Sequence, residues 1–349
     1  MSRYLNENLA RLAPYVPGEQ PQDKTYIKLN TNENPYFPSK YSMERITRGE
    51  LENLRLYSDP ENTELSEVIA AYYGVNSKEV LPVNGSDEAL AFAFCAFGGC
   101  GAVFPDVTYG FYKVFAGLFG VDYKELPLNA DFTVDCAAYM RVKRTVFLAN
   151  PNAQTGIYLP VSEIEKIIAS NPDNVVVIDE AYVDFGGESC VPLIKKYKNL
   201  VIVQTFSKSR SLAGARAGFA IADESLINDL KRVKFSFNPY NVNRLSSALA
   251  AEAMRDRKYF EECVDRIIFS RESLISELKT LGFEVLPSKA NFVLAKYPQI
   301  SGEKLYKELK ARGVLVRHFT DRRISDYVRI TIGSDGDMRV LTDKIKEII

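Results

Sequence analysis

Histidine is almost absent from this chain: His318 is the only one among 349 residues. A metal site built on several histidines, or a Ser-His-Asp triad, would have to depend on that single side chain, so the sequence argues against both. The five cysteines are scattered and form no Cys-X-X-Cys pair. We interpret them as small, mostly buried side chains of a protein in a reducing, cytoplasmic setting.

Long apolar runs and an excess of charge of either sign are also missing. No apolar stretch approaches the length of a helix that spans a bilayer, and the first residues are too polar for a secretory signal. The 44 basic and 45 acidic side chains give a net charge of -1. This balance excludes a broadly basic nucleic-acid surface and a polyacidic tail. We therefore expect small-molecule partners, with neither nucleic acid nor membrane among them.

The composition that remains, 46% hydrophobic and 26% charged, is typical of a globular protein, and the length suggests about two domains. After an arm and loop over about residues 1–40, short β-branched runs alternate with helical stretches. We predict helices at 64–73, 87–97 and 162–169, and strands at 103–104, 145–148, 175–178, 201–203 and 219–221. Nearly continuous apolar strands with helices between them indicate an α/β fold with a mostly parallel sheet covered on both faces.

The pattern changes near residue 240. We predict a long charged helical stretch from about 244 to 281 that contains a kink. Short strands at 283–286, 292–295, 314–316 and 328–332 then alternate with two helices, which is typical of a small α+β domain. We predict a large α/β domain over residues 40–243. The small domain would combine the N-terminal arm, 1–39, with residues 244–349.

Two polar loops follow apolar strands, at the sheet edge where ligands bind in open α/β folds. One runs from Asp179 to Tyr182. The other contains the sequence TFSK, which ends at Lys208, and Arg216 follows eight residues later. A lysine whose pKa shifts can form a Schiff base with an aldehyde, and hydroxyls beside an arginine suit a phosphate. Taken singly, the first loop is explained as well by a strand that ends in an acidic loop, and the second is explained better by a polar loop with a solvated lysine.

Two further segments contain turn-forming residues. In the first, Ser86 can cap the helix that follows, and the free N–H groups of that helix's first turn favour an anion. Gly85 allows the backbone to approach such an anion closely. The second segment, NPNAQTG at 150–156, predicts a turn, which accounts for its proline and glycine better than for Asn152. A capped helix and a plain turn remain the alternatives.

In this order and spacing, the four segments resemble the fold-type I transferases that depend on pyridoxal 5'-phosphate (PLP). Within the class II aminotransferase family, the chain resembles the histidinol-phosphate aminotransferases. The resemblance covers nearly the whole chain and includes NENP at 32–35, LYSDP at 56–60, PYNVN at 239–243 and VRITIG at 328–333. Two segments depart from it. Ala153-Gln154 stands where the family commonly has Asn-Pro, and residues 209–211 lack the apolar side chains often found after the lysine.

The resemblance implies a catalytic set and a cofactor site. Lys208 is implied as the Schiff-base lysine and general base, Asp179 as the partner of the pyridine nitrogen, and Tyr182, with Asn152, as a donor to the ring's phenolic oxygen. Tyr109 would stack on the ring. The other implied cofactor-binding residues surround the phosphate: Gly85, Ser86, Asp87, Thr205, Ser207, Arg216 and, from the second subunit of a homodimer, Tyr57.

On the substrate side, the resemblance implies Arg329 as the binder of a glutamate carboxylate and Arg317 as a second anion-binding arginine. Tyr15, Asn32 and Tyr240 would line the pocket. The implied reaction is ping-pong amino transfer between histidinol phosphate and 2-oxoglutarate, with L-glutamate as the other partner, in histidine biosynthesis; no metal is implied. An aromatic-amino-acid aminotransferase, a threonine-phosphate decarboxylase on the same scaffold and a non-enzymatic module remain open alternatives.

Overall fold

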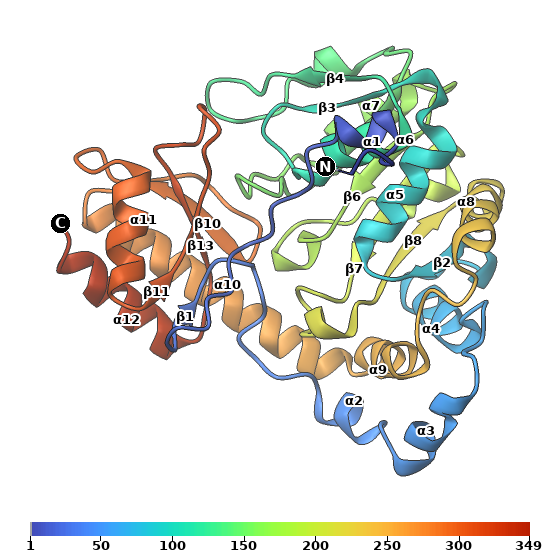
Figure 1. Cartoon of the computed structure of the whole chain (residues 1–349), viewed down its shortest axis with the longest axis horizontal. Coiled ribbons are helices and arrows are strands. Elements are labelled where there is room, and N and C mark those ends of the chain that lie inside the picture. The colour runs from blue at the N-terminus through green and yellow to red at the C-terminus, as the bar shows by residue number, and fades with distance from the viewer. Residues whose placement is uncertain (1) are drawn as a thin grey trace.

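The computed structural model describes residues 2–349, which form a large sheet, a smaller sheet and the helices around them (Figure 1). The large sheet has the strand order β2-β8-β7-β6-β5-β3-β4. These strands are β2 Val80–Val83, β3 Ala102–Pro105, β4 Tyr123–Leu126, β5 Thr145–Ala149, β6 Val176–Asp179, β7 Leu200–Thr205 and β8 Gly218–Ala222. Strand β8 runs antiparallel to both β2 and β7, and the other neighbouring pairs are parallel. The predicted mostly parallel α/β sheet is confirmed.

The large sheet is covered on both faces because its strands carry apolar side chains on both. Successive residues of a strand point to opposite faces. In β7, Val201 and Val203 join one core cluster, and Leu200 and Ile202 join another. The first face is covered by α5 (Ser86–Phe97), α6 (Phe111–Phe119) and α8 (Glu224–Phe237). The second is covered by α4 (Thr63–Tyr73), α7 (Val161–Ser170) and α9 (Arg244–Arg255).

The predicted helices at 64–73, 87–97 and 162–169 correspond to α4, α5 and α7, and the five predicted strands correspond to β3, β5, β6, β7 and β8. The sequence analysis missed β4, whose residues YKEL are mostly polar. An edge strand needs few apolar contacts, which explains why its pattern gave no signal. It also missed α6, because FYKVFAGLF is rich in the aromatic and β-branched residues that favour strands.

The C-terminal third contains the antiparallel sheet β12-β13-β10-β9. Its strands are β9 Glu284–Val285, β10 Phe292–Lys296, β12 Arg317–His318 and β13 Val328–Thr331, and its helices are α10 Arg257–Thr280, α11 Gly302–Ala311 and α12 Asp335–Lys346. The predicted kink in the long helical stretch falls at Asp256. This residue ends α9, and its side chain then accepts from the N–H of Tyr259 to start α10.

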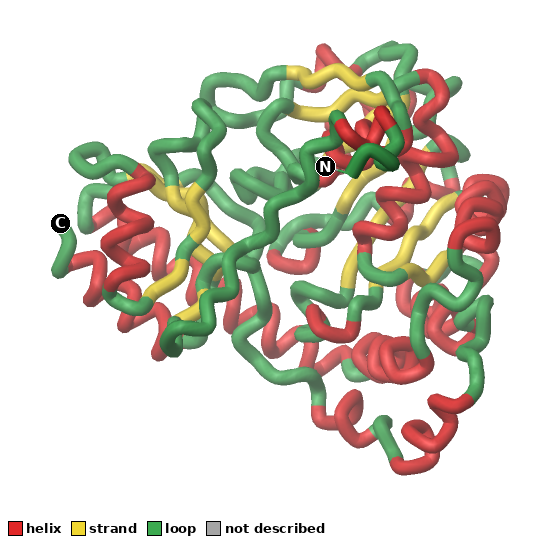
Figure 2. Tube along the Cα trace, viewed as in Figure 1, coloured by secondary structure: helices red, strands yellow, loops and turns green. Residues whose placement is uncertain are grey.

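The N-terminal arm connects the two parts of the molecule. Helix α1 (Glu7–Ala10) contacts α6, and β1 (Ile27–Lys28) pairs with β11 (Val314–Leu315). Figure 2 shows the intervening residues as a long loop between these two places. Two short helices, α2 (Lys40–Glu44) and α3 (Arg48–Glu52), follow the arm. No helix among residues 2–349 has the length and apolar character to cross a membrane.

Helix α9 packs against α4 and contributes Ala250, Ala251 and Met254 to the core on the second face of the large sheet. The pairing of β1 with β11 brings the N-terminal arm to the C-terminal third of the chain. The domain boundaries themselves, 40–243 against 1–39 with 244–349, stay a prediction.

Candidate active site

A cavity of about 240 Å³ lies at the carboxyl ends of β6 and β7. In parallel sheets these ends share one edge, so the loops that follow the strands meet there. The N-terminal arm and strands β12 and β13 supply the opposite wall. Residues predicted from the sequence that line the cavity are Tyr15, Asn32, Ser86, Asp87, Tyr109, Asp179, Tyr182, Thr205, Ser207, Lys208, Arg216, Arg317 and Arg329.

Lys208 is half-buried in this cavity and is held at two points by the N-terminal segment. Its Nζ donates to the main-chain oxygen of Thr31 at 3.1 Å. Its own main-chain oxygen accepts from Nδ2 of Asn34 at 3.1 Å, and the same amide donates to the main-chain oxygen of Ser209. Asn34 was predicted only as part of the NENP segment, and its contact with the lysine loop was not expected.

Asp179 ends β6 and is 4% exposed. Burial raises the pKa of its carboxyl group to about 6, although bonds from the hydroxyl of Tyr112 and the N–H of Ala181 act in the opposite direction. A carboxylate placed in such surroundings is stabilised by a neighbouring cation. Tyr112 was not predicted as a site residue because it lies on α6, the helix that was also not predicted.

Gly85 and Arg216 form a tight corner at one end of the cavity. The backbone of Gly85 has a φ of 75°, and a Cβ there would lie 2.5 Å from Nη2 of Arg216. The guanidinium of Arg216 donates to Asp87 at 3.1 Å, and Asp87 also accepts from the hydroxyl of Tyr109 at 2.6 Å. The hydroxyl groups in this part of the wall belong to Ser86, Thr205 and Ser207.

The expected capping role of Ser86 is wrong. Gly85 occupies the cap position of α5, Ser86 is the first helical residue, and no side chain caps this helix. The glycine fits this position because of its positive φ, and the carboxylate of Glu88 instead accepts from the N–H of Asn84 at 2.7 Å. The first N–H groups of α5 are therefore without a side-chain cap, which suits the binding of an anion.

Arg329 and Arg317 are directly opposite each other in the β13–β12 pair. Like charges in this arrangement are unfavourable unless an anion lies near them. Nη1 of Arg329 donates to the main-chain oxygen of Ala153 at 2.9 Å, while its buried Nε has no partner among residues 2–349. Burial lowers the pKa of this guanidinium. Arg317 donates to the main-chain oxygens of Val16 and Pro17 in the arm.

Several predicted residues have different surroundings from those expected. The side chain of Asn32 reaches the cavity, but its amide is already bonded to Tyr182 and Thr331. Asn152 lies behind the cavity wall, where its Nδ2 donates to the main-chain oxygen of Val107. Tyr240 lies outside the cavity, and its ring stacks on that of Tyr57 with centroids 4.5 Å apart at the surface of the chain. Tyr57 was expected at the site of a second subunit, so its place outside this cavity leaves that expectation a prediction.

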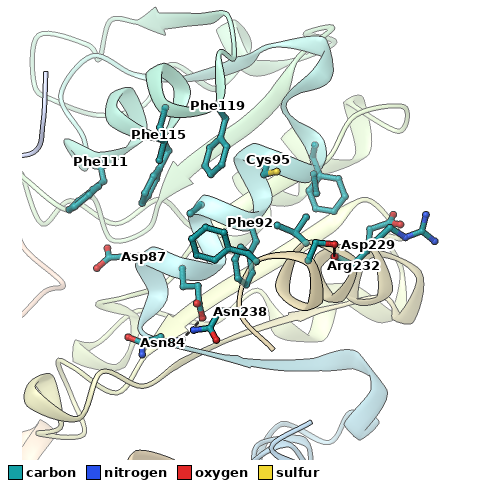
Figure 3. A pocket seen from close by; sticks show the side chains of 18 residues that line it. Asn84, Asp87, Phe92, Cys95, Phe111, Phe115, Phe119, Asp229, Arg232 and Asn238 are labelled. Atoms are coloured by element: carbon teal, nitrogen blue, oxygen red, sulfur yellow. Dashed lines mark hydrogen bonds between the residues drawn. The ribbon is translucent and has the colours of Figure 1, made fainter. Parts of the chain in front are cut away.

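A larger, mostly apolar groove of about 1050 Å³ adjoins the cavity (Figure 3). It lies between α5, α6 and α8. The side chains of Phe111, Phe115 and Phe119 follow one another at four-residue steps along one face of α6. Asp87 lines both the groove and the cavity, so the two hollows meet at the corner that contains Gly85 and Arg216. The sequence analysis did not predict this groove.

Comparison with known proteins gives matches to aminotransferases over the full chain, in agreement with the resemblance stated from the sequence. Residues 24–345 match the family model of class I and II aminotransferases. A histidinol-phosphate aminotransferase of Clostridium acetobutylicum is 50% identical over 351 residues, which cover 100% of both chains. One of Brachyspira hyodysenteriae is 48% identical over 352 residues, which cover 100% of this chain and 99% of that protein.

Among solved structures, the histidinol-phosphate aminotransferase of Sinorhizobium meliloti in complex with PLP matches with a TM-score of 0.88. The match has 22% identity and covers 100% of this chain and 99% of that one. At this identity it shows the fold alone, which is that of a fold-type I transferase. Together with the sequence matches, it establishes that the chain belongs to the class I and II aminotransferase family. The expected resemblance is confirmed, and the chain is an aminotransferase.

Proposed function

We propose that this chain is a PLP-dependent aminotransferase that moves an amino group between L-histidinol phosphate and 2-oxoglutarate, with L-glutamate as the second amino compound. The observation that carries the proposal is the shared cavity. Lys208 and Asp179 line it, and a corner suited to phosphate lies at one end. The full-length relatives that are 48–50% identical carry the name of this enzyme.

The residues present fit PLP. The cofactor is a phosphorylated pyridine aldehyde, so it needs a phosphate cradle, an amine and an acceptor for a protonated ring nitrogen. The corner at Gly85 would be filled by any larger side chain, and Arg216 and the uncapped start of α5 adjoin it. These donors match the oxygens of a phosphate. Lys208 supplies the amine, and buried Asp179 supplies the acceptor.

The cofactor, when bound, supplies an electron-withdrawing ring that stabilises negative charge on the carbon beside the amino group. Around it, each residue has a task that follows from its position. Asp179, held by the hydroxyl of Tyr112, accepts a hydrogen bond from the ring nitrogen and keeps its proton in place. Nζ of Lys208, once free of the carbonyl of Thr31, would take the proton from Cα of the amino donor and deliver it to the cofactor carbon that carries the aldehyde group.

Substrate recognition is assigned to Arg329 and Arg317. A bidentate guanidinium suits both the carboxylate of glutamate and the phosphate of histidinol phosphate. Arg329 is fixed to the main chain at Ala153, whereas Arg317 is bonded to the arm at Val16 and Pro17. An anion that binds Arg317 therefore competes with the carbonyl oxygens of the arm. An aromatic aminotransferase and a threonine-phosphate decarboxylase are less well supported, because neither name occurs among these full-length relatives.

A homodimer and a cytoplasmic location belong to the same proposal. Tyr57 is 79% exposed and lies outside the cavity of its own chain. In the proposed dimer, a second copy covers the apolar groove, which adjoins the phosphate corner at Asp87, and brings its Tyr57 to that corner. The exposed ring of Phe237 lines the same groove and gains a partner in this arrangement.

A half-reaction screen tests the proposed function. PLP-loaded protein is mixed separately with L-histidinol phosphate, L-glutamate, phenylalanine, tyrosine and threonine phosphate while the cofactor absorption is followed. We expect rapid conversion with histidinol phosphate and glutamate and slow conversion with the aromatic amino acids. Faster conversion with phenylalanine or tyrosine than with histidinol phosphate would change the assignment to an aromatic aminotransferase. Release of carbon dioxide from threonine phosphate would indicate the decarboxylase.

A further inference from the structure

Asn32 has a hydrogen-bonding partner for each of its polar groups. It is 1% exposed and has a φ of 57°, the left-handed conformation that asparagine tolerates better than most residues. Its N–H donates to the hydroxyl of Thr331, and its main-chain oxygen accepts from Asn291. Its side chain lies between the hydroxyls of Thr331 and Tyr182, at 3.0 Å from each. Of the groups of Asn32, only the second N–H of its amide has no partner among residues 2–349, so little of this side chain is left for a substrate.

Thr331 determines which way the amide of Asn32 points. The hydroxyl oxygen of Thr331 accepts from the N–H of Asn32, and its single proton is donated to Oδ1 of the same residue. The amide oxygen therefore lies on the side of Thr331 and the amide nitrogen on the side of Tyr182. The reverse orientation would leave the proton of Thr331 facing an N–H group.

The hydroxyl of Tyr182 consequently acts as an acceptor toward Asn32. Its own proton has no acceptor among residues 2–349. The ring of Tyr182 is packed edge-on against Phe292, with centroids 5.2 Å apart, so the ring position is fixed and only the direction of the O–H bond is left to set. Because Tyr182 lines the cavity, the proton has only the cavity to point into.

The geometry points to Asn32 as a positioning residue that directs the Tyr182 O–H toward an anionic oxygen of the bound cofactor, with Thr331 preventing the amide from turning over. This inference rests on the proposed PLP-dependent function. It replaces the expectation that Asn32 binds substrate. A hydrogen bond donated to an anionic oxygen favours the ionised form of the group that carries it. The pair of Asn32 and Thr331 therefore holds the spectral pH midpoint of the bound chromophore low.

The test is a pH titration of the cofactor absorption in PLP-loaded protein, with Thr331→Val compared with Thr331→Ser. The valine replaces the hydroxyl with a methyl group, which removes the bond to the amide oxygen of Asn32 and the acceptor of its main-chain N–H. The amide can then rotate and accept the proton of Tyr182. We expect the spectral midpoint to rise by roughly 1 pH unit, the order of effect of losing one hydrogen bond to a charged group. The serine keeps the hydroxyl and should retain the wild-type midpoint. Asn32→Asp, which can only accept, should raise it as well.

A Tyr182→Phe background separates this role from a structural one. Without the phenol, Thr331→Val should cause no further shift of the spectral midpoint. Any shift of the midpoint that Asn32→Asp still causes in this background measures the effect of its added charge alone. Equal midpoints for Thr331→Val and Thr331→Ser, or a full Thr331→Val shift in the Tyr182→Phe background, would overturn the inference. If the wild-type protein showed no cofactor absorption, the proposed function and this inference would both be overturned. This result differs from failure of the inference alone, in which the cofactor absorbs but the midpoints do not follow the expected pattern.

Discussion

The guanidinium of Arg329 is bonded to the side chain of Gln154: Nη1 donates to Oε1 at 3.2 Å, in addition to its bond to the main-chain oxygen of Ala153. Gln154 stands where the family commonly has a proline, which has no side-chain acceptor. The turn at 150–156 therefore contributes to the proposed anion site, and its residues Ala153 and Gln154 line the same cavity as Lys208. It helps to hold an arginine that lies on a strand of the other sheet.

We expect Gln154→Ala to raise the KM for glutamate about two- to tenfold, the range of one net hydrogen bond, with little change in kcat. Gln154→Glu keeps an acceptor near Arg329 but adds a charge that competes with the anionic substrate, so it should raise KM further. Steady-state kinetics with glutamate and with histidinol phosphate would measure both effects. Unchanged KM values in both variants would show that the main-chain bond at Ala153 holds Arg329 without help.

Lys208→Ala should abolish amino transfer and the covalent attachment of PLP while the fold is retained, because no other lysine within residues 2–349 lines the cavity. Borohydride reduction followed by peptide mass mapping would locate the modified residue in the wild-type protein. Lys289→Ala, at a lysine outside the cavity, is the control and should leave the label in place. A reducible adduct in the Lys208→Ala protein would contradict the assignment of the lysine.

Glu180, next to Asp179, predicts a pH-dependent stability. Burial raises the pKa of its carboxyl to about 7, although bonds from Ser189, Cys190 and Gln204 act against the rise. In the unfolded chain the same group has a pKa of about 4.3. The folded chain therefore binds this proton more tightly, so the free energy of unfolding falls as the pH rises from about 4 toward about 7.

Denaturant unfolding of the cofactor-free protein at several pH values would measure this dependence. We expect Glu180→Gln to make the free energy of unfolding depend less steeply on pH between about pH 4 and about pH 7, whatever its effect on absolute stability. Glu67→Gln, at an exposed glutamate of α4, should leave the slope unchanged. If the free energy of unfolding varied with pH in the same way for wild type and Glu180→Gln, Glu180 would have the same pKa in the folded and unfolded chains.

The sequence predicted the residues at strand ends well, since apolar strands followed by polar loops imply a shared edge. Asp179 and Lys208 are far apart in sequence and line one cavity for this reason. Contacts that depend on the path of the N-terminal arm could not be predicted from the sequence. The bonds that Lys208 donates to Thr31 and that Arg317 donates to Val16 have no local signal, because they arise when β1 pairs with β11.

Side-chain roles were harder to predict than side-chain positions. Asn32 was expected at the cavity and is there, but its partners, Thr331 and Tyr182, lie about 300 and 150 residues further along the chain. Tyr240 shows the opposite case, because it was expected in the pocket and lies outside the cavity of a single chain. No pattern within one sequence reports what a second copy adds.

Subunit mixing tests the proposed dimer. Lys208→Ala leaves its own site inactive but carries an intact Tyr57, whereas Tyr57→Ala carries an intact Lys208. In a hybrid dimer, one site receives both residues. Random exchange of equal amounts should give about a quarter of the wild-type number of complete sites, since half of the dimers are hybrid and each has one complete site. Activity equal to the sum of the two parents, or full activity in a monomer, would refute the shared site.

The two arginines predict different losses for the two substrates. Arg329 is anchored to the main chain at Ala153 and faces the cavity, so Arg329→Ala should weaken both half-reactions. Arg317→Ala should weaken the binding of histidinol phosphate more than the binding of phenylalanine, because a phosphate dianion offers more acceptor oxygens to a second guanidinium. The loss of one charge-assisted bidentate contact costs about 1.5–3 kcal/mol, on the order of ten- to a hundredfold in binding.

Arg317→Lys provides the matched variant for this prediction. It keeps the charge but loses the planar fork, so its histidinol-phosphate binding should lie between that of wild type and Arg317→Ala. Half-reaction rates at varied substrate concentration would give the binding constants for both substrates. Arg317 also bonds to the carbonyl oxygens of Val16 and Pro17, so a loosened arm would weaken every substrate to a similar degree. Equal losses of binding for phenylalanine and histidinol phosphate would therefore show that Arg317 acts by holding the arm. A loss of binding for histidinol phosphate alone would show that Arg317 binds the phosphate.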